Sequence, residues 1–142
     1  TGVQTCALPI LPDDLLARSY FNPETGKRDY KSLPEDESLR AARNREATAR
    51  FCWSPYMHNP KLKGRLHRIN IPTLFLWGTA DRIIGDGYGR AYCAMIPGAQ
   101  FQPIERAGHY PHIEQPEEFA RRALAFADSG AKAPAKTSAK AG

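Results

Sequence analysis

The sequence predicts an α/β fold whose second half is a βαβα unit of a parallel sheet. Residues 71–77 form a short, continuously apolar run bounded by proline and glycine, which is typical of a strand buried on both faces. A helical pattern over 86–96 follows, then a second strand at 101–105 and an amphipathic helix over 116–127. Because the connections are short, we expect a right-handed crossover and two parallel strands.

The region before this unit is predicted to be mainly helical. A short helical segment covers residues 13–19. A long helix is expected to begin at a capping box formed by Ser32 and Glu35 and to end before Ser54-Pro55. Its apolar residues form only a thin stripe, which is typical of a helix that lies over a core.

Each predicted strand is followed by a glycine turn that delivers a side chain suited to acid–base chemistry. The first turn leads from Gly78 to Asp81, and the second leads through Gly108 to His109. Because the carboxyl ends of parallel strands meet at one edge of a sheet, we expect Asp81 and His109 to lie within hydrogen-bonding distance. In such a pair the carboxylate fixes the imidazole tautomer while the other ring nitrogen takes a proton from a nucleophile. Asp81 and His109 are the predicted catalytic residues, the alternative being a turn-capping aspartate beside a loop histidine.

These two motifs resemble those of the cap-bearing α/β-hydrolases. Residues 72–82 match the pattern P-T-L-x-L-W-G-x-x-D-R, and residues 108–116 match G-H-x-P-H-x-E-x-P. The resemblance implies the C-terminal part of such an enzyme, in which a nucleophile, an aspartate and a histidine follow one another along the chain. The group includes carboxylesterases, lactonases, carbon–carbon bond hydrolases of ring-cleavage products, epoxide hydrolases and haloalkane dehalogenases. No G-x-S-x-G nucleophile elbow occurs in the sequence, so the chain is interpreted as a truncated hydrolase that is inactive by itself.

The chain is expected to contain four segments. Residues 1–10 are interpreted as translated sequencing adaptor, because a common short-read adaptor encodes these ten residues in one reading frame. The resemblance implies that residues 11–60 are part of a helical cap and that residues 61–128 are the C-terminal hydrolase core. Residues 129–142 have too few apolar side chains to fold and are predicted to be disordered.

Four further side chains are candidates for substrate binding. Trp53, Tyr56 and His58 form a cluster at the end of the predicted cap, and His112 follows His109 by three residues. Aromatic residues at a helix end are more often part of a core, and His112 is expected to pack on the last helix rather than line a pocket. Two histidines at this spacing without a third ligand do not make a metal site, and no metal or cofactor is predicted.

The composition favours a small-molecule substrate over a nucleic acid or a membrane as the partner. Hydrophobic residues make up 42% of the chain, and no apolar run is long enough to span a bilayer. The net charge is +5, of which Lys132, Lys136 and Lys140 in the tail contribute three. The basic stretch over 58–68 has neither interleaved aromatic residues nor a nucleic-acid-reading motif, so it is interpreted as a solvated surface.

The leading functional hypothesis is that the parent enzyme hydrolyses a small, partly apolar ester-like or ring-cleavage substrate. One alternative is a non-catalytic protein of the same fold that binds a small molecule, which the residue at the nucleophile position would reveal. The other is a basic nucleic-acid-binding module centred on residues 58–68, which a salt-dependent binding assay would reveal. Cys52 and Cys93 lack metal or redox spacing and are expected to be buried thiols, which fits a cytoplasmic location. The sequence predicts no oligomeric state.

Overall fold

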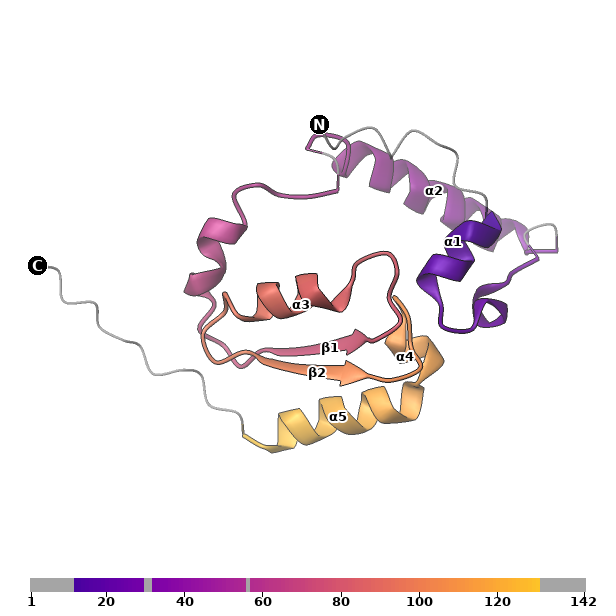
Figure 1. Ribbon diagram of the computed structural model, residues 1–142. Helices are drawn as coiled ribbons and strands as arrows, with labels where there is room; N and C mark the ends of the chain where they lie inside the picture. Colours follow the sequence, from indigo (N-terminus) through magenta and orange to yellow (C-terminus); the bar gives the residue numbers. More distant parts are fainter. Residues whose placement is uncertain (1–11, 30–31, 56, 131–142) are drawn as a thin grey trace, which may run out of the picture. The chain divides into compact units, whose positions relative to one another are not determined.

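The computed structural model describes residues 12–29, 32–55 and 57–130 (Figure 1). The predicted adaptor segment, Tyr56 and residues 131–142 of the predicted disordered tail lie outside the described residues. The described chain divides into two compact units, one of which contains the predicted sheet.

The centre of the sheet-containing unit is a parallel pair of strands. β1 (Leu74–Gly78) pairs with β2 (Gln100–Ile104) in the same direction. The connecting helix α3 (Asp86–Cys93) covers one face of the pair, and α5 (Pro116–Asp128) covers the other (Figure 1). This order confirms the predicted βαβα unit.

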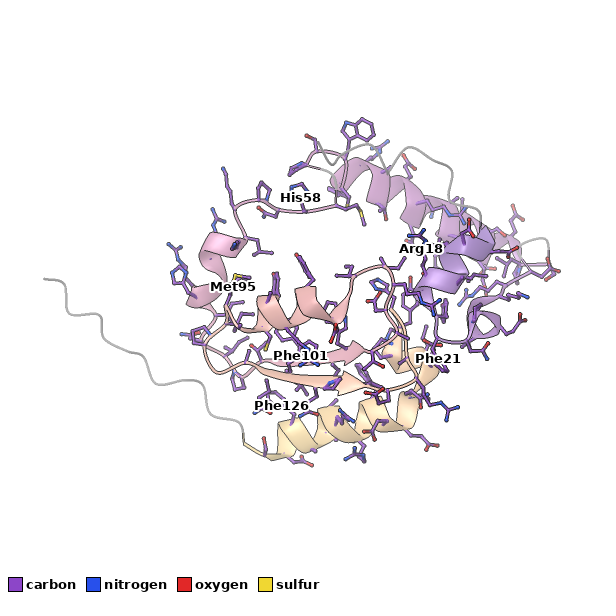
Figure 2. All side chains as sticks on the ribbon, in the orientation of Figure 1. Arg18, Phe21, His58, Met95, Phe101 and Phe126 are labelled. Atoms are coloured by element: carbon purple, nitrogen blue, oxygen red, sulfur yellow. The ribbon has the colours of Figure 1, made fainter. Side chains whose placement is uncertain are left out.

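Strand side chains alternate between the two helices, and this alternation explains the layered packing. Phe101 of β2 faces α3, where the Arg90 guanidinium lies 4.5 Å from the centroid of its ring. Trp77 of β1 stacks on the same ring, with the centroids 6.3 Å apart. Gly89 lets α3 approach these rings, since a Cβ there would lie 2.7 Å from the Trp77 ring. Phe126 of α5 lies at the opposite face of the sheet (Figure 2).

The two compact units divide the chain differently from the predicted segments, and the assignment of residues 11–60 to a cap and of residues 61–128 to a core stays a prediction. Helix α1 (Pro12–Ser19) and the 3₁₀ helix η2 (Pro23–Gly26) belong to the sheet-containing unit and not with residues 28–60. The physical reason is a set of long-range backbone hydrogen bonds at the end of α1. The Arg82 N–H donates to the carbonyl of Arg18 at 3.1 Å, and the His109 N–H donates to the carbonyl of Ser19 at 2.6 Å.

The second unit, residues 28–68, contains α2 (Glu35–Phe51) and the 3₁₀ helix η3 (Lys63–Arg68). The predicted capping box is wrong, because the Ser32 hydroxyl donates to the carbonyl of Asp29 at 3.1 Å and α2 has no side-chain cap. None of the side chains of α2 is buried. Its larger apolar residues, Leu39 and Phe51, are 49% and 87% exposed.

The two cysteines in the described residues differ in burial. Cys93 at the end of α3 is buried as predicted, and this burial raises the pKa of its thiol. Cys52 follows the last turn of α2 and is only half-buried, so the prediction of a buried thiol is wrong at this position. Both thiols are free.

Helix α5 is hydrogen-bonded to the sheet through Arg122, and both of its arginines bond to Glu118 of the same helix. Arg122 Nη1 donates to the carbonyl of Pro103 in β2 at 2.6 Å. Arg121 and Arg122 both donate to the carboxylate of Glu118, with 2.7 Å between Arg121 Nη2 and Glu118 Oε1. Hydrogen bonds from Arg121, and next from Arg122, lower the pKa of Glu118 from its usual 4.5 to about 2.

Replacing Arg121 with glutamine is expected to raise the pKa of Glu118 from about 2 toward its ordinary value, because the largest stabilising hydrogen bond is lost. The folded-state pKa lies below the unfolded-state value, so this contact favours folding above pH 4.5 and ceases to do so as the pH falls to about 2. An NMR titration of the Glu118 carboxyl carbon measures the midpoint of its protonation, which is the pKa. Arg90→Gln, which breaks the separate ion pair with Asp86, serves as the control. An unchanged midpoint in Arg121→Gln would contradict the assignment.

The outer edge of β1 has no strand partner among the described residues. The strand consists of Leu74, Phe75, Leu76 and Trp77 before its terminal glycine, and these four side chains are only half-buried. An apolar strand with an unpaired edge is a template for association with other chains.

We therefore expect the 142-residue chain to self-associate, and Leu74→Lys to lower the associated fraction because a charge at a strand edge opposes pairing. Size-exclusion chromatography with light scattering measures this fraction. Ile71→Lys is the matched control, since it adds the same charge at an exposed position before the strand. A monomeric parent chain, or an equal effect of both variants, would show that the edge is not responsible.

Candidate active site

Asp81 lies at the carboxyl end of β1, three residues after Gly78, and its side chain is only 4% exposed. Its Oδ1 accepts hydrogen bonds from the backbone N–H groups of Ile83 at 2.8 Å and Ile84 at 2.9 Å. These two bonds fix the carboxylate and direct Oδ2 toward His109. The turn-capping role therefore occupies one oxygen and leaves the other for the histidine.

His109 follows β2 and lies opposite Asp81, as predicted. Its Nδ1 is 2.9 Å from Asp81 Oδ2. Because a carboxylate only accepts hydrogen bonds, Nδ1 carries the hydrogen and Nε2 is the ring nitrogen that remains to take up a proton. The His109 side chain is 33% exposed whereas the carboxylate is buried, so the pair has one solvent-accessible end.

Two glycines allow three segments of the chain to meet beside this pair. A Cβ at Gly78 would lie 2.0 Å from the carbonyl oxygen of Gly108 and 2.4 Å from that of Ala107. A Cβ at Gly108 would lie 2.4 Å from the carbonyl oxygen of Ser19. Both positions exclude any larger residue, because the neighbouring atoms are backbone and cannot rotate away. The Ala80 N–H also donates to the carbonyl of Ala107 at 2.9 Å and joins the two turns.

Glu114 is a residue of this site to which the sequence analysis assigned no role. It lies in the short helix α4 (Pro111–Glu114), which was also not predicted. Its carboxylate accepts backbone hydrogen bonds from Gly108, Phe21 and Asn22 at 2.7, 3.1 and 2.9 Å. The signal that could have identified it is its place in the second motif, where a proline starts a helical turn that ends at the glutamate.

The structure places the other candidate residues as follows. The ring of His112 lies edge-on to Phe119 of α5, with the centroids 5.8 Å apart, which is the packing that the sequence favoured over a pocket position. Trp53 and His58 belong to the second unit, where the Trp53 side chain is 76% exposed. Tyr56 lies outside the described residues. A substrate-binding role for these residues stays a prediction.

Within residues 12–29, 32–55 and 57–130, no three His, Cys, Asp or Glu side chains are grouped so that they could hold a metal ion. No helix in the same ranges combines the length and the apolarity needed to cross a membrane. At the carboxyl edge of the sheet, the contact between Asp81 and His109 has the geometry of a proton-transfer pair.

The comparison with protein families is consistent with this arrangement. The model of the Alpha/beta hydrolase family matches residues 4–122. The chain belongs to the α/β hydrolase family. The match begins inside the segment interpreted as adaptor, and that interpretation stays a prediction.

Among the relatives of this α/β hydrolase is a 2-hydroxy-6-oxononadienedioate/2-hydroxy-6-oxononatrienedioate hydrolase of Cupriavidus pinatubonensis. The two are 37% identical over 62 residues, which are 44% of this chain and 22% of that protein. A 2-hydroxy-6-oxo-6-phenylhexa-2,4-dienoate hydrolase of Burkholderia cepacia is 35% identical over 66 residues, which are 46% of this chain and 23% of that protein. Each match thus spans less than a quarter of the relative's length.

A solved structure supports the same fold. A serine hydrolase involved in carbazole degradation superposes with a TM-score of 0.54 at 25% identity. The superposition covers 67% of this α/β hydrolase and 36% of the other chain.

In this α/β hydrolase, Gly78→Ala is expected to lower the free energy of unfolding by about 1–3 kcal/mol, because the added methyl group overlaps fixed backbone atoms. Gly87→Ala is the matched control, because nothing lies within 4 Å of a Cβ at that helical position. There, alanine is expected to stabilise the chain by about 0.4–1 kcal/mol. Urea unfolding followed by tryptophan fluorescence, in the Leu74→Lys background, measures both. Equal effects of the two changes would contradict the close approach at Gly78.

Proposed function

We propose that this chain supplies the aspartate and the histidine, Asp81 and His109, of a nucleophile–Asp–His triad. The enzyme hydrolyses a small, partly apolar substrate. The observation that supports the proposal is the 2.9 Å contact between His109 Nδ1 and Asp81 Oδ2 at the carboxyl edge of the sheet. A buried carboxylate beside a partly exposed imidazole suits a base that must reach a substrate while its orientation is held from behind.

In the proposed reaction, His109 Nε2 takes a proton from the attacking group while Asp81 stabilises the imidazolium that forms. The histidine then returns this proton to the leaving group, and in a second step it activates a water molecule. The sequence holds no G-x-S-x-G elbow. The proposed nucleophile therefore comes from a segment other than these 142 residues.

The proposed substrate class is an ester-like compound or a product of aromatic ring cleavage. The names of two relatives support this class, since both are hydrolases of 2-hydroxy-6-oxo acids. The triad chemistry itself needs no cofactor, and we propose a small molecule as the partner. The free thiols of Cys52 and Cys93 support a cytoplasmic location.

A graft tests the proposed roles in a complete enzyme. Residues 69–130 of this chain replace the corresponding strands and helices of the Cupriavidus pinatubonensis relative, and turnover of that enzyme's own substrate is measured. Asp81→Asn and His109→Gln are each expected to lower kcat by at least about 10³-fold, because they remove the correct tautomer or the base. Asp86→Asn is the control, since this carboxylate pairs with Arg90 of α3 and is about half exposed.

Two outcomes would contradict the proposal. If the graft is folded and active and neither Asp81→Asn nor His109→Gln lowers its kcat, the result would favour a non-catalytic binding role for this segment. Turnover of an activated aryl ester by the 142-residue chain, lost in His109→Gln, would show that the nucleophile lies within this sequence. Circular dichroism of each variant shows whether the graft is folded.

A further inference from the structure

We propose that Glu114 is a positioning residue for His109, acting through the backbone of the loop that carries the histidine. The inference rests on the proposed function of His109 as the base. The hydrogen bonds of the Glu114 carboxylate go to backbone N–H groups, so its effect on His109 would pass through the peptide groups that it binds.

The carboxylate of Glu114 connects two parts of the chain that are far apart in sequence. Its Oε2 accepts from the N–H of Gly108 at 2.7 Å and from the N–H of Phe21 at 3.1 Å, while Oε1 accepts from the N–H of Asn22 at 2.9 Å. Hydrogen bonds to an ionised acceptor are about twice as strong as neutral ones. One side chain therefore holds the histidine loop and the segment after α1 together.

The peptide groups on which Glu114 acts lie directly beside His109. Its bond to the Gly108 N–H fixes the residue before the histidine, and the His109 N–H is itself fixed by the carbonyl of Ser19 at 2.6 Å. Since Glu114 also holds the chain just after Ser19, it positions both partners of this second bond. Loss of the carboxylate should therefore free the His109 backbone on both sides.

The neighbouring residue secures the other end of the same loop. Gln115 Nε2 donates to the carbonyl of Arg106 at 3.1 Å, and Arg106 has a φ of 55°, in the left-handed region that favours glycine. The loop is thus held in an unfavourable backbone conformation by contacts from the end of α4. Without such contacts it has alternative conformations, and a shift of about 1 Å is enough to impair a catalytic pair.

The Asp81 carboxylate has local hydrogen bonds of its own that do not involve Glu114. Its Oδ1 is held by the N–H groups of Ile83 and Ile84, which belong to the turn after β1. Glu114 makes no hydrogen bond to that turn. A change at Glu114 should therefore displace the imidazole more than the carboxylate, and the hydrogen bond between His109 Nδ1 and Asp81 Oδ2 should report the change.

NMR spectroscopy of the full chain in the Leu74→Lys background tests the inference without measuring activity. The readouts are amide hydrogen exchange at Gly108, Phe21 and Asn22, and the downfield signal of the His109 Nδ1 proton. Glu114→Ala is expected to speed exchange at all three amides by about tenfold or more and to remove the His109 signal. Glu117→Gln, an exposed carboxylate in the first turn of α5, should change neither readout.

Glu114→Gln provides a finer test, because an amide has one accepting oxygen and one donating nitrogen. With its oxygen in the position of Oε2, glutamine keeps the bonds to Gly108 and Phe21 and loses the bond to Asn22. We expect faster exchange at Asn22 alone, with the Gly108 amide protected and the His109 signal retained. Protection of the Trp77 amide, whose N–H faces β2, shows that each variant is folded.

The inference is overturned if any folded variant shows faster hydrogen exchange at the Gly108 amide and keeps the His109 Nδ1 signal. In that case Glu114 would only anchor the segment after α1. It is also overturned if Asn22 stays protected in Glu114→Gln. Failure of the proposed function would give a different result. A graft that stays active with His109→Gln would contradict the catalytic role of His109. It would not change the NMR results for the Glu114 variants.

Discussion

The site depends on the close approach of three backbone segments at the carboxyl end of the sheet. The turn after β1, the loop after β2 and the end of α1 come so near one another that Gly78 and Gly108 have no room for a side chain. The short contacts are made by peptide groups, which cannot rotate away as side chains can. The separation of Asp81 and His109 is therefore set mainly by main-chain geometry, and their side chains complete it with one hydrogen bond.

The sequence was sufficient to predict the sheet and the contact between Asp81 and His109, because both follow from local patterns. The apolar run before Gly78 identifies β1, the helical periodicity identifies α5, and a glycine turn after each strand identifies Asp81 and His109. These patterns involve residues close together in sequence, and parallel topology then brings the strand ends to one edge.

The parts that were missed depend on contacts between distant residues or on competition between local ones. Glu114 and the segment after α1 are separated by more than 90 residues, and hydrogen bonds from that backbone to the Glu114 side chain produce no periodicity in the sequence. Ser32 has the spacing of a capping box, but its hydroxyl bonds to the turn before the helix, which satisfies it equally well. A sequence motif indicates which groups can interact, but the partner that each group binds depends on the fold.

Pro103 determines which edge of the strand pair can accept a further strand. The N–H of Gln100 and the carbonyl of Ile104 both point to the β1 side, so the groups of Pro103, between them, point outward. Proline has no N–H to offer there, and its carbonyl is taken by Arg122. The outer edge of β2 is thus closed to a further strand, whereas β1 contains no proline. Any strand that joins this pair must therefore add next to β1, which makes β2 the terminal strand of the sheet.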